Sequence, residues 1–93
     1  MWPFRQNADM SIDAAVDDAI ALAAVEWRTF EANSGIPTTI NLRDRVPHFA
    51  AAFRPLMARR FPSLRAAPEE LVLLVTAEGI VASGTIPRRL VEL

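Results

Sequence analysis

The most regular hydrophobic pattern lies in the first third of the chain. Seven apolar side chains fall within about 100° on a wheel of 3.6 residues per turn, and these are Ile12, Val16, Ala19, Ile20, Ala23, Trp27 and Phe30. Ser11 precedes the pattern as an N-cap residue, and Gly35 follows it where a helix usually ends. The pattern predicts an amphipathic helix over residues 11–34, with Trp27 in the core.

The middle third of the chain predicts a second helix, interrupted by proline. After a short helical turn, Pro47 opens a helix that should reach residue 61, with one apolar face made of Val46, Phe49, Phe53, Leu56 and Met57. Pro55 lacks the amide that would bond to the carbonyl of Ala51 and clashes with it, so we expect a kink or a break there. The small residues 50–52 would let another helix approach.

The longest nearly uncharged apolar run, residues 67–85, has two interpretations. Pro68 at its start, two glutamates after it and Gly84 at its end are typical helix signals, and they favour a helix over 68–83. The many β-branched residues and a glycine at position 79 also fit a β-hairpin at about 71–86. A mid-helix glycine costs roughly 1 kcal/mol, which burial of the surrounding side chains can offset, so the helix is preferred.

The two ends of the chain carry weaker patterns. Residues 1–10 show no period and predict a flexible N-terminal tail with two aromatic side chains, Trp2 and Phe4. After Gly84, Thr85 can cap a last short helix. The prediction is therefore an all-α fold, a compact bundle of four to five short helices over residues 11–93, with an α+β fold containing the hairpin as the alternative.

Composition narrows the class of protein. The 93 residues form one domain, with an apolar share of 52% that is slightly rich for this size. Some apolar residues lie outside the predicted stripes and suggest a surface covered by a partner or by a second copy; they are Val25, Phe61, Val91 and Leu93. The absence of cysteine excludes disulfides and thiolate chemistry. No export signal or membrane-spanning run is evident, so a cytoplasmic location is expected.

The sequence contains no complete motif for catalysis or for metal binding. His48 has no candidate nucleophile near it in the sequence, and a single histidine cannot build a His-rich metal site. Asp13, Asp17 and Asp18 lie on a predicted helix without the loop geometry of calcium sites. The spacing from Gly79 to Thr85 resembles a phosphate-binding loop but lacks its lysine. We expect no catalytic activity, no cofactor and no metal.

Charge is segregated along the chain. Residues 1–34 hold two arginines against six acidic residues, a net charge of −4, whereas residues 35–65 hold six arginines against Asp44, a net charge of +5. The acidic helix can face the basic segment within the fold or across a homodimer. Alternatively, the arginines form a patch for an acidic protein or a phosphate backbone.

The sequence thus predicts a small non-enzymatic protein-interaction module, an adaptor, inhibitor or accessory subunit that binds a partner protein and can form a homo-oligomer. A nucleic-acid-associated protein without sequence specificity is the alternative. The predicted partner-binding residues are Arg54, Arg59, Arg65, Trp2 and Phe4.

Overall fold

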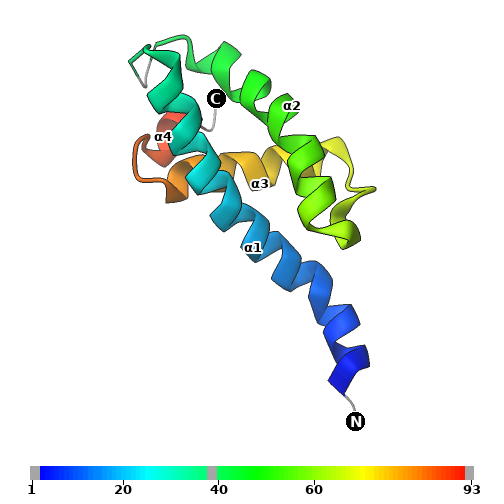
Figure 1. Ribbon diagram of the computed structural model, residues 1–93. Helices are drawn as coiled ribbons and strands as arrows, with labels where there is room; N and C mark the ends of the chain where they lie inside the picture. Colours follow the sequence, from blue (N-terminus) through cyan, green and yellow to red (C-terminus); the bar gives the residue numbers. More distant parts are fainter. Residues whose placement is uncertain (1–2, 38–39, 92–93) are drawn as a thin grey trace.

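The computed structural model describes the backbone of residues 3–37 and 40–91 and, within those ranges, the side chains from residue 12 onward. The chain folds into helices α1 (Pro3–Ser34), α2 (Leu42–Arg60), α3 (Glu69–Ala82) and α4 (Arg88–Val91), with a single 3₁₀ turn, η1 (Pro62–Leu64), after α2 (Figure 1). The described residues contain no strand. The predicted all-α bundle is confirmed, and the alternative hairpin at 71–86 is wrong.

Helix α3 forms where the sequence signals placed it. Pro68 is its N-cap residue in an extended conformation, and two glutamates occupy the first turn, where the helix dipole favours negative charge. Gly84 follows the helix with a φ of 79°, the left-handed conformation that glycine adopts most readily. Burial of Val75, Thr76 and Ile80, each 0% exposed, outweighs the weak helix propensity of their β-branched side chains.

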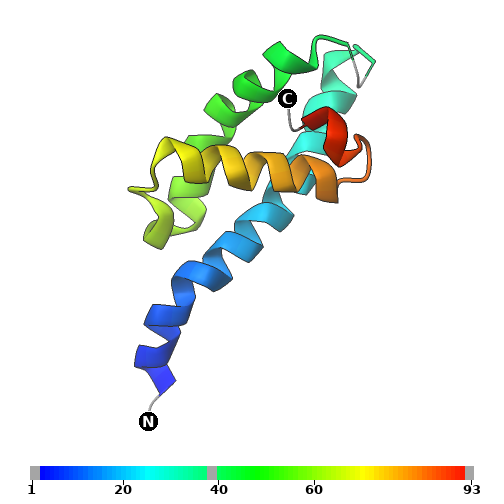
Figure 2. The same ribbon diagram turned by 180° about the vertical axis from the view of Figure 1, so that it is seen from behind.

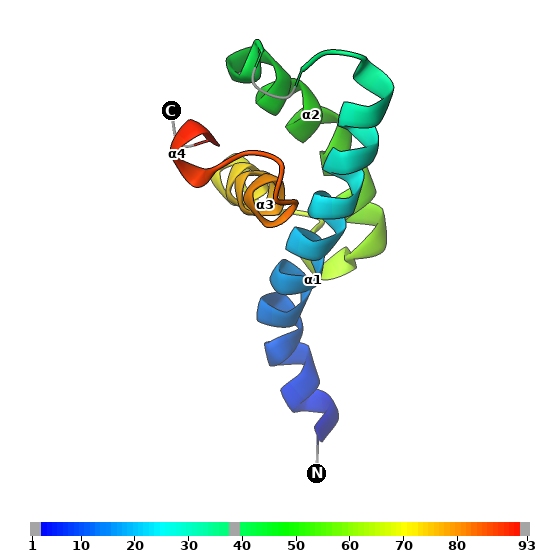
Figure 3. The same ribbon diagram turned by 90° about the vertical axis from the view of Figure 1, so that its left-hand side faces the viewer.

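Helix α1 is longer than its apolar stripe. It begins at Pro3, because proline is accepted in a first helical turn, well before the predicted start at Ser11. Trp27 is 0% exposed, as predicted, but Ile12 is 51% exposed and was wrongly placed in the core. Figures 1 and 3 give the reason, because the N-terminal part of α1 projects beyond the other helices.

Helix α2 continues through both of its prolines. The break predicted at Pro55 is absent, since one helix runs from Leu42 to Arg60. Phe53 and Met57 lie on either side of Pro55 along the chain and are 2% and 1% exposed, so burial in one core holds the helix together. Ala51, whose carbonyl loses its bond, is exposed, and water can satisfy that oxygen.

Helix α3 packs across α1 and α2, which form an antiparallel pair (Figures 2 and 3). The closest approach is at Gly79, where an added Cβ would overlap with the Cβ of Ala23 and lie 3.0 Å from the carbonyl oxygen of Ile20. An aromatic cluster fills the space between α1 and α2, with ring centroids 5.2 Å apart for Trp27 and Phe49. The mid-helix glycine therefore permits the crossing on which the core depends.

Polar contacts fix the turn between α3 and α4 against α1. The indole Nε1 of Trp27 donates to Thr85 Oγ1 at 3.1 Å, and the guanidinium of Arg28 donates twice to the carbonyl oxygen of Ser83, at 3.1 and 2.9 Å. The indole N–H is satisfied although the ring is fully buried. This turn is consequently part of the same folded unit as the long helices.

The projecting end of α1 makes the molecule long and narrow. Its principal extents are 50 × 22 × 21 Å and its radius of gyration is 14.1 Å, whereas a compact domain of this length has a radius of gyration of about 12 Å. A 32-residue helix is roughly 48 Å long at 1.5 Å per residue. The long dimension is thus the length of α1 itself.

Candidate interaction surface

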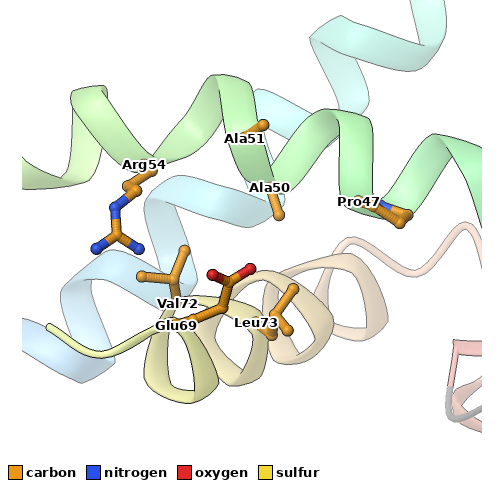
Figure 4. A pocket seen from close by; sticks show the side chains of 7 residues that line it. All are labelled: Pro47, Ala50, Ala51, Arg54, Glu69, Val72 and Leu73. Atoms are coloured by element: carbon orange, nitrogen blue, oxygen red, sulfur yellow. The ribbon is translucent and has the colours of Figure 1, made fainter.

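A groove lies between α2 and α3. It has a volume of about 300 Å³ and is lined by Pro47, Ala50, Ala51, Arg54, Glu69, Val72 and Leu73. Figure 4 shows the lining side chains of the two helices facing each other, with α1 behind them. No residue of α1 belongs to the lining, so the groove opens on the side of the bundle that α1 leaves free.

Small side chains on α2 create the groove. Ala50 is 5% exposed and Val72 is 3% exposed, and these two form its apolar floor. Ala51 and Pro47 are exposed along the α2 wall, and Leu73, 41% exposed, stands on the α3 wall. The prediction that small residues in α2 admit another helix therefore applies at Ala50, whereas Ala51 stays uncovered.

Arg54 places a positive charge at one end of the groove. Its Nη2 donates to the carbonyl oxygen of Ala67 at 3.0 Å, which joins α2 to the loop before α3. Within the described part of the chain, Arg54 forms no ion pair with Glu69 or with any other carboxylate. The groove therefore carries two separate opposite charges, Arg54 on α2 and Glu69 on α3, beside its apolar side chains (Figure 4).

The predicted site residues do not form one continuous patch. Arg54, Arg59 and Arg65 are all exposed. Arg54 and Arg59 are five positions apart in α2, and so point about 140° away from each other. Trp2 lies outside the described residues, as does the side chain of Phe4, so their role in partner binding stays a prediction.

Arg45 is the arginine that sequence reasoning missed. Only 7% of it is exposed, its Nη1 donates to the carbonyl oxygen of Pro37 at 2.8 Å, and its Nη2 lies 3.6 Å from Glu31 Oε2. The guanidinium also stands over the ring of Trp27, 5.4 Å from the centroid. Arg45 thus closes the connection between α1 and α2, and no sequence signal separated it from its exposed neighbours.

The pairing of Glu31 with Arg45 accounts for little of the charge segregation. It is the one ion pair that joins α1 to the basic segment among the described residues. Asp13, Asp17 and Asp18 are exposed on α1 and take part in none. Within one copy of the described chain, the acidic helix and the basic segment therefore remain largely unmatched.

The other described ion pair is local to the C-terminal end. Arg88 donates to both carboxylate oxygens of Glu78, at 2.7 and 2.8 Å. These hydrogen bonds, helped by the positive charge of Arg88, hold the pKa of Glu78 below its usual 4.5 against the opposing effect of burial. The pair connects α3 to α4 and leaves no charge for a binding site.

Exposed apolar side chains occur at several places. Among the residues whose side chains the structure describes, six large apolar ones are more than 40% exposed, and they are Ile12, Val25, Ile36, Ile40, Leu73 and Leu74. Val25 was predicted to be uncovered and is 54% exposed, while Phe61 and Val91 are half-buried and Leu93 lies outside the described residues. Of the six, only Leu73 borders the groove.

The described residues include few side chains that could serve in catalysis or metal binding. The exposed ring of His48 lies against Phe30, with centroids 6.0 Å apart. The described residues contain no group of three histidine or acidic side chains that could hold a metal ion. No helix in the described part of the chain is both long and apolar enough to cross a membrane. The groove between α2 and α3 is the candidate binding site.

Comparison with known proteins gives no further guide. No family model, no curated protein and no solved structure matches the chain.

Proposed function

We propose that the protein is a small non-enzymatic interaction module that binds a helix of a partner protein in the groove between α2 and α3. The observation that carries the proposal is the groove itself, an open apolar channel with Ala50 and Val72 as its floor and Arg54 at one end. A groove of this kind accepts the apolar face of an amphipathic helix. The charge at its end favours an acidic residue on that helix.

Two leucines on α3 supply a matched test. Leu73 lines the groove, while its neighbour Leu74 does not, and they are 41% and 50% exposed. Leu73→Gln and Leu74→Gln therefore remove similar exposed apolar surfaces at two different places. Both variants should keep the helical content of the parent by circular dichroism, because neither side chain is in the core.

The assay is affinity capture from the native host's lysate with the parent and the two variants, followed by quantitative mass spectrometry. We expect a protein that the parent and Leu74→Gln recover equally and that Leu73→Gln recovers at least about tenfold less, a difference of about 1.4 kcal/mol. Equal recovery by all three baits would refute binding in the groove.

A second candidate function, association with nucleic acid, has one supporting observation. Five arginines of α2 and the following turn are exposed, and they are Arg43, Arg54, Arg59, Arg60 and Arg65. Such residues bind a phosphate backbone through counterion release, so affinity for random-sequence DNA would fall steeply between about 50 and 200 mM salt. Absence of measurable binding at the lower salt concentration would remove this candidate.

The arginines can be separated by substitution. Arg59→Ala and Arg65→Ala together remove two exposed charges and leave Arg54 with its hydrogen bond to Ala67. Loss of DNA binding in this double variant, with partner capture unchanged, would favour the nucleic-acid function. An interaction module that uses these two arginines should instead lose partner capture, with DNA binding unchanged.

A further inference from the structure

We propose that the helix that occupies the groove is the projecting part of α1 from a second copy of the same chain, so that the protein is a reciprocal homodimer. The inference rests on the proposed function, because it names the occupant of the same groove. It is carried by Ile12, which is exposed at the end of the buried stripe, by the exposed Asp13 beside it, and by a groove with an apolar floor and Arg54 at one end.

The projecting part of α1 continues the stripe that is buried further along the helix. Ala15, Ala19 and Ala23 are 8%, 0% and 0% exposed, whereas Ile12, on the same face, is 51% exposed. Figures 1 and 3 show why, since the other helices end before this part of α1. On this face of α1, burial therefore ends between Ala15 and Ile12, within one helical turn.

The uncovered stripe has an acidic flank. On an ideal helix, Asp13 lies about 100° from Ile12 and about 60° from the half-buried Val16, while Asp18 lies on the opposite side. Asp13 is exposed and forms no ion pair with any described residue. A surface that covers Ile12 must therefore accommodate a carboxylate beside it.

The groove meets both requirements. Its floor is apolar at Ala50 and Val72, and Arg54 supplies a charge that no described carboxylate neutralises. Residues 1–34 carry a net charge of −4 and residues 35–65 a net charge of +5. Two copies related by a twofold axis would each present Ile12 and Asp13 to the apolar floor and Arg54 of the other's groove, which gives an isologous contact made twice.

Intramolecular docking does not produce this contact. α1 lies behind the groove, and it is a single continuous helix that cannot fold back onto the groove's open side (Figure 4). The overall charge of −1 adds little repulsion between copies. A second copy is consequently the partner whose chemistry the chain itself supplies.

The test is sedimentation equilibrium of the parent up to about 300 µM, at about 20 and about 500 mM salt, a range that spans strong and weak screening. We expect a concentration-dependent dimer that is weaker at high salt. Asp13→Arg and Ala51→Glu should each weaken dimerisation at least about tenfold, because each places like charges at the contact. Asp18→Arg and Ala52→Glu are the controls, since Asp18 faces away from the stripe and Ala52 lies outside the groove lining.

Mixing the two weakened variants is the decisive step. In a mixture, the helix with Arg at position 13 meets the groove with Glu at position 51, and the two unaltered surfaces meet each other. A heterodimer should form with an affinity near that of the parent, although neither variant dimerises well alone. Ile12→Arg and Leu73→Glu, both at exposed positions of the proposed contact, replace either variant if circular dichroism shows that it does not fold.

Three results would overturn the inference. These are a parent that stays monomeric at low salt, variants that dimerise as well as their controls, and a mixture that does not recover dimerisation. A monomeric parent that still captures a lysate protein through Leu73 would retain the proposed function and reject self-association. A dimeric parent that captures no lysate protein through Leu73 would retain self-association and reject the proposed function.

Discussion

Gly79→Ala offers a direct test of the helix crossing. Alanine is favoured over glycine inside a helix by roughly 1 kcal/mol, so the substitution would stabilise an uncrowded helix. At this position the new Cβ overlaps with the Cβ of Ala23 and lies 3.0 Å from the carbonyl oxygen of Ile20. Neither group is the end of a flexible side chain, and α3 must therefore move away from α1.

The gain in helix propensity and the crowding by the new Cβ oppose each other, and we expect the crowding to cost more than the propensity gains. Overpacking of a well-packed core costs up to about 3 kcal/mol, which leaves a net loss of about 2 kcal/mol after the gain in helix propensity. For a domain of this size that loss lowers Tm by roughly 8 to 16 °C. The measurement is urea denaturation followed by circular dichroism at 222 nm.

A compensating substitution separates crowding from other causes. Ala23→Gly alone should cost about 2 kcal/mol, from helix propensity and one buried methyl group. In Gly79→Ala/Ala23→Gly the two helix propensities cancel and the overlap with the Ala23 Cβ disappears. The free energy of unfolding of the double variant should therefore fall by only about 1 kcal/mol. Compared with the sum of the two single losses, the two changes then couple favourably by about 3 kcal/mol. Ala21→Gly, at an exposed position of α1, reports the propensity cost alone. Stabilisation by Gly79→Ala, or simple additivity, would show that the crossing is not tight at this point.

Three further substitutions test the core and the polar contacts. Trp27→Ala should cost about 3 to 5 kcal/mol, enough to unfold a marginal domain, and an unchanged Tm would contradict its placement in the core. Arg45→Ala should cost about 3 to 5 kcal/mol because it leaves Glu31 buried without its cation, and Arg45→Ala/Glu31→Gln should recover part of this loss in urea denaturation. Glu78→Gln should lose less than about 1 kcal/mol at pH 7, because the pair with Arg88 is exposed to solvent. The pKa of Glu78 is lowered in the folded state, so its contribution is present above pH 4.5 and is lost as the pH falls through the folded value. Parent and variant should converge once the pH is below that value.

Local sequence signals predicted the secondary structure well where they agreed with burial. Pro68 and Gly84 marked the ends of α3 because capping depends on backbone conformation, which a few neighbouring residues determine. Of the kink or break predicted at Pro55, the break does not occur, since the side chains on either side of it are buried in one core and hold α2 together. Tertiary packing decides such cases, and the sequence order alone does not show it.

The candidate site was less predictable. The groove exists because Ala51 and Leu73 lie on neighbouring helices at a distance set by the packing of α3 across α1, and nothing in either local sequence reports that distance. Arg54 was singled out for its charge, but Arg59 points elsewhere, because a run of arginines on a helix is spread around its axis. Arg45 resembled the other arginines in sequence and differs only through the rings and carbonyl that surround it.

The hydrogen bond between Trp27 and Thr85 joins residues 58 positions apart, and the crossing of Ala23 and Gly79 spans a similar length of chain. Closing so long a loop costs conformational entropy before any contact repays it. Helical proteins that fold within microseconds rely mostly on local contacts. Here α1 and its main partner α3 are separated in the sequence by the whole of α2, so the rate of refolding should be limited by the docking of α3 and should respond strongly to substitutions at Gly79.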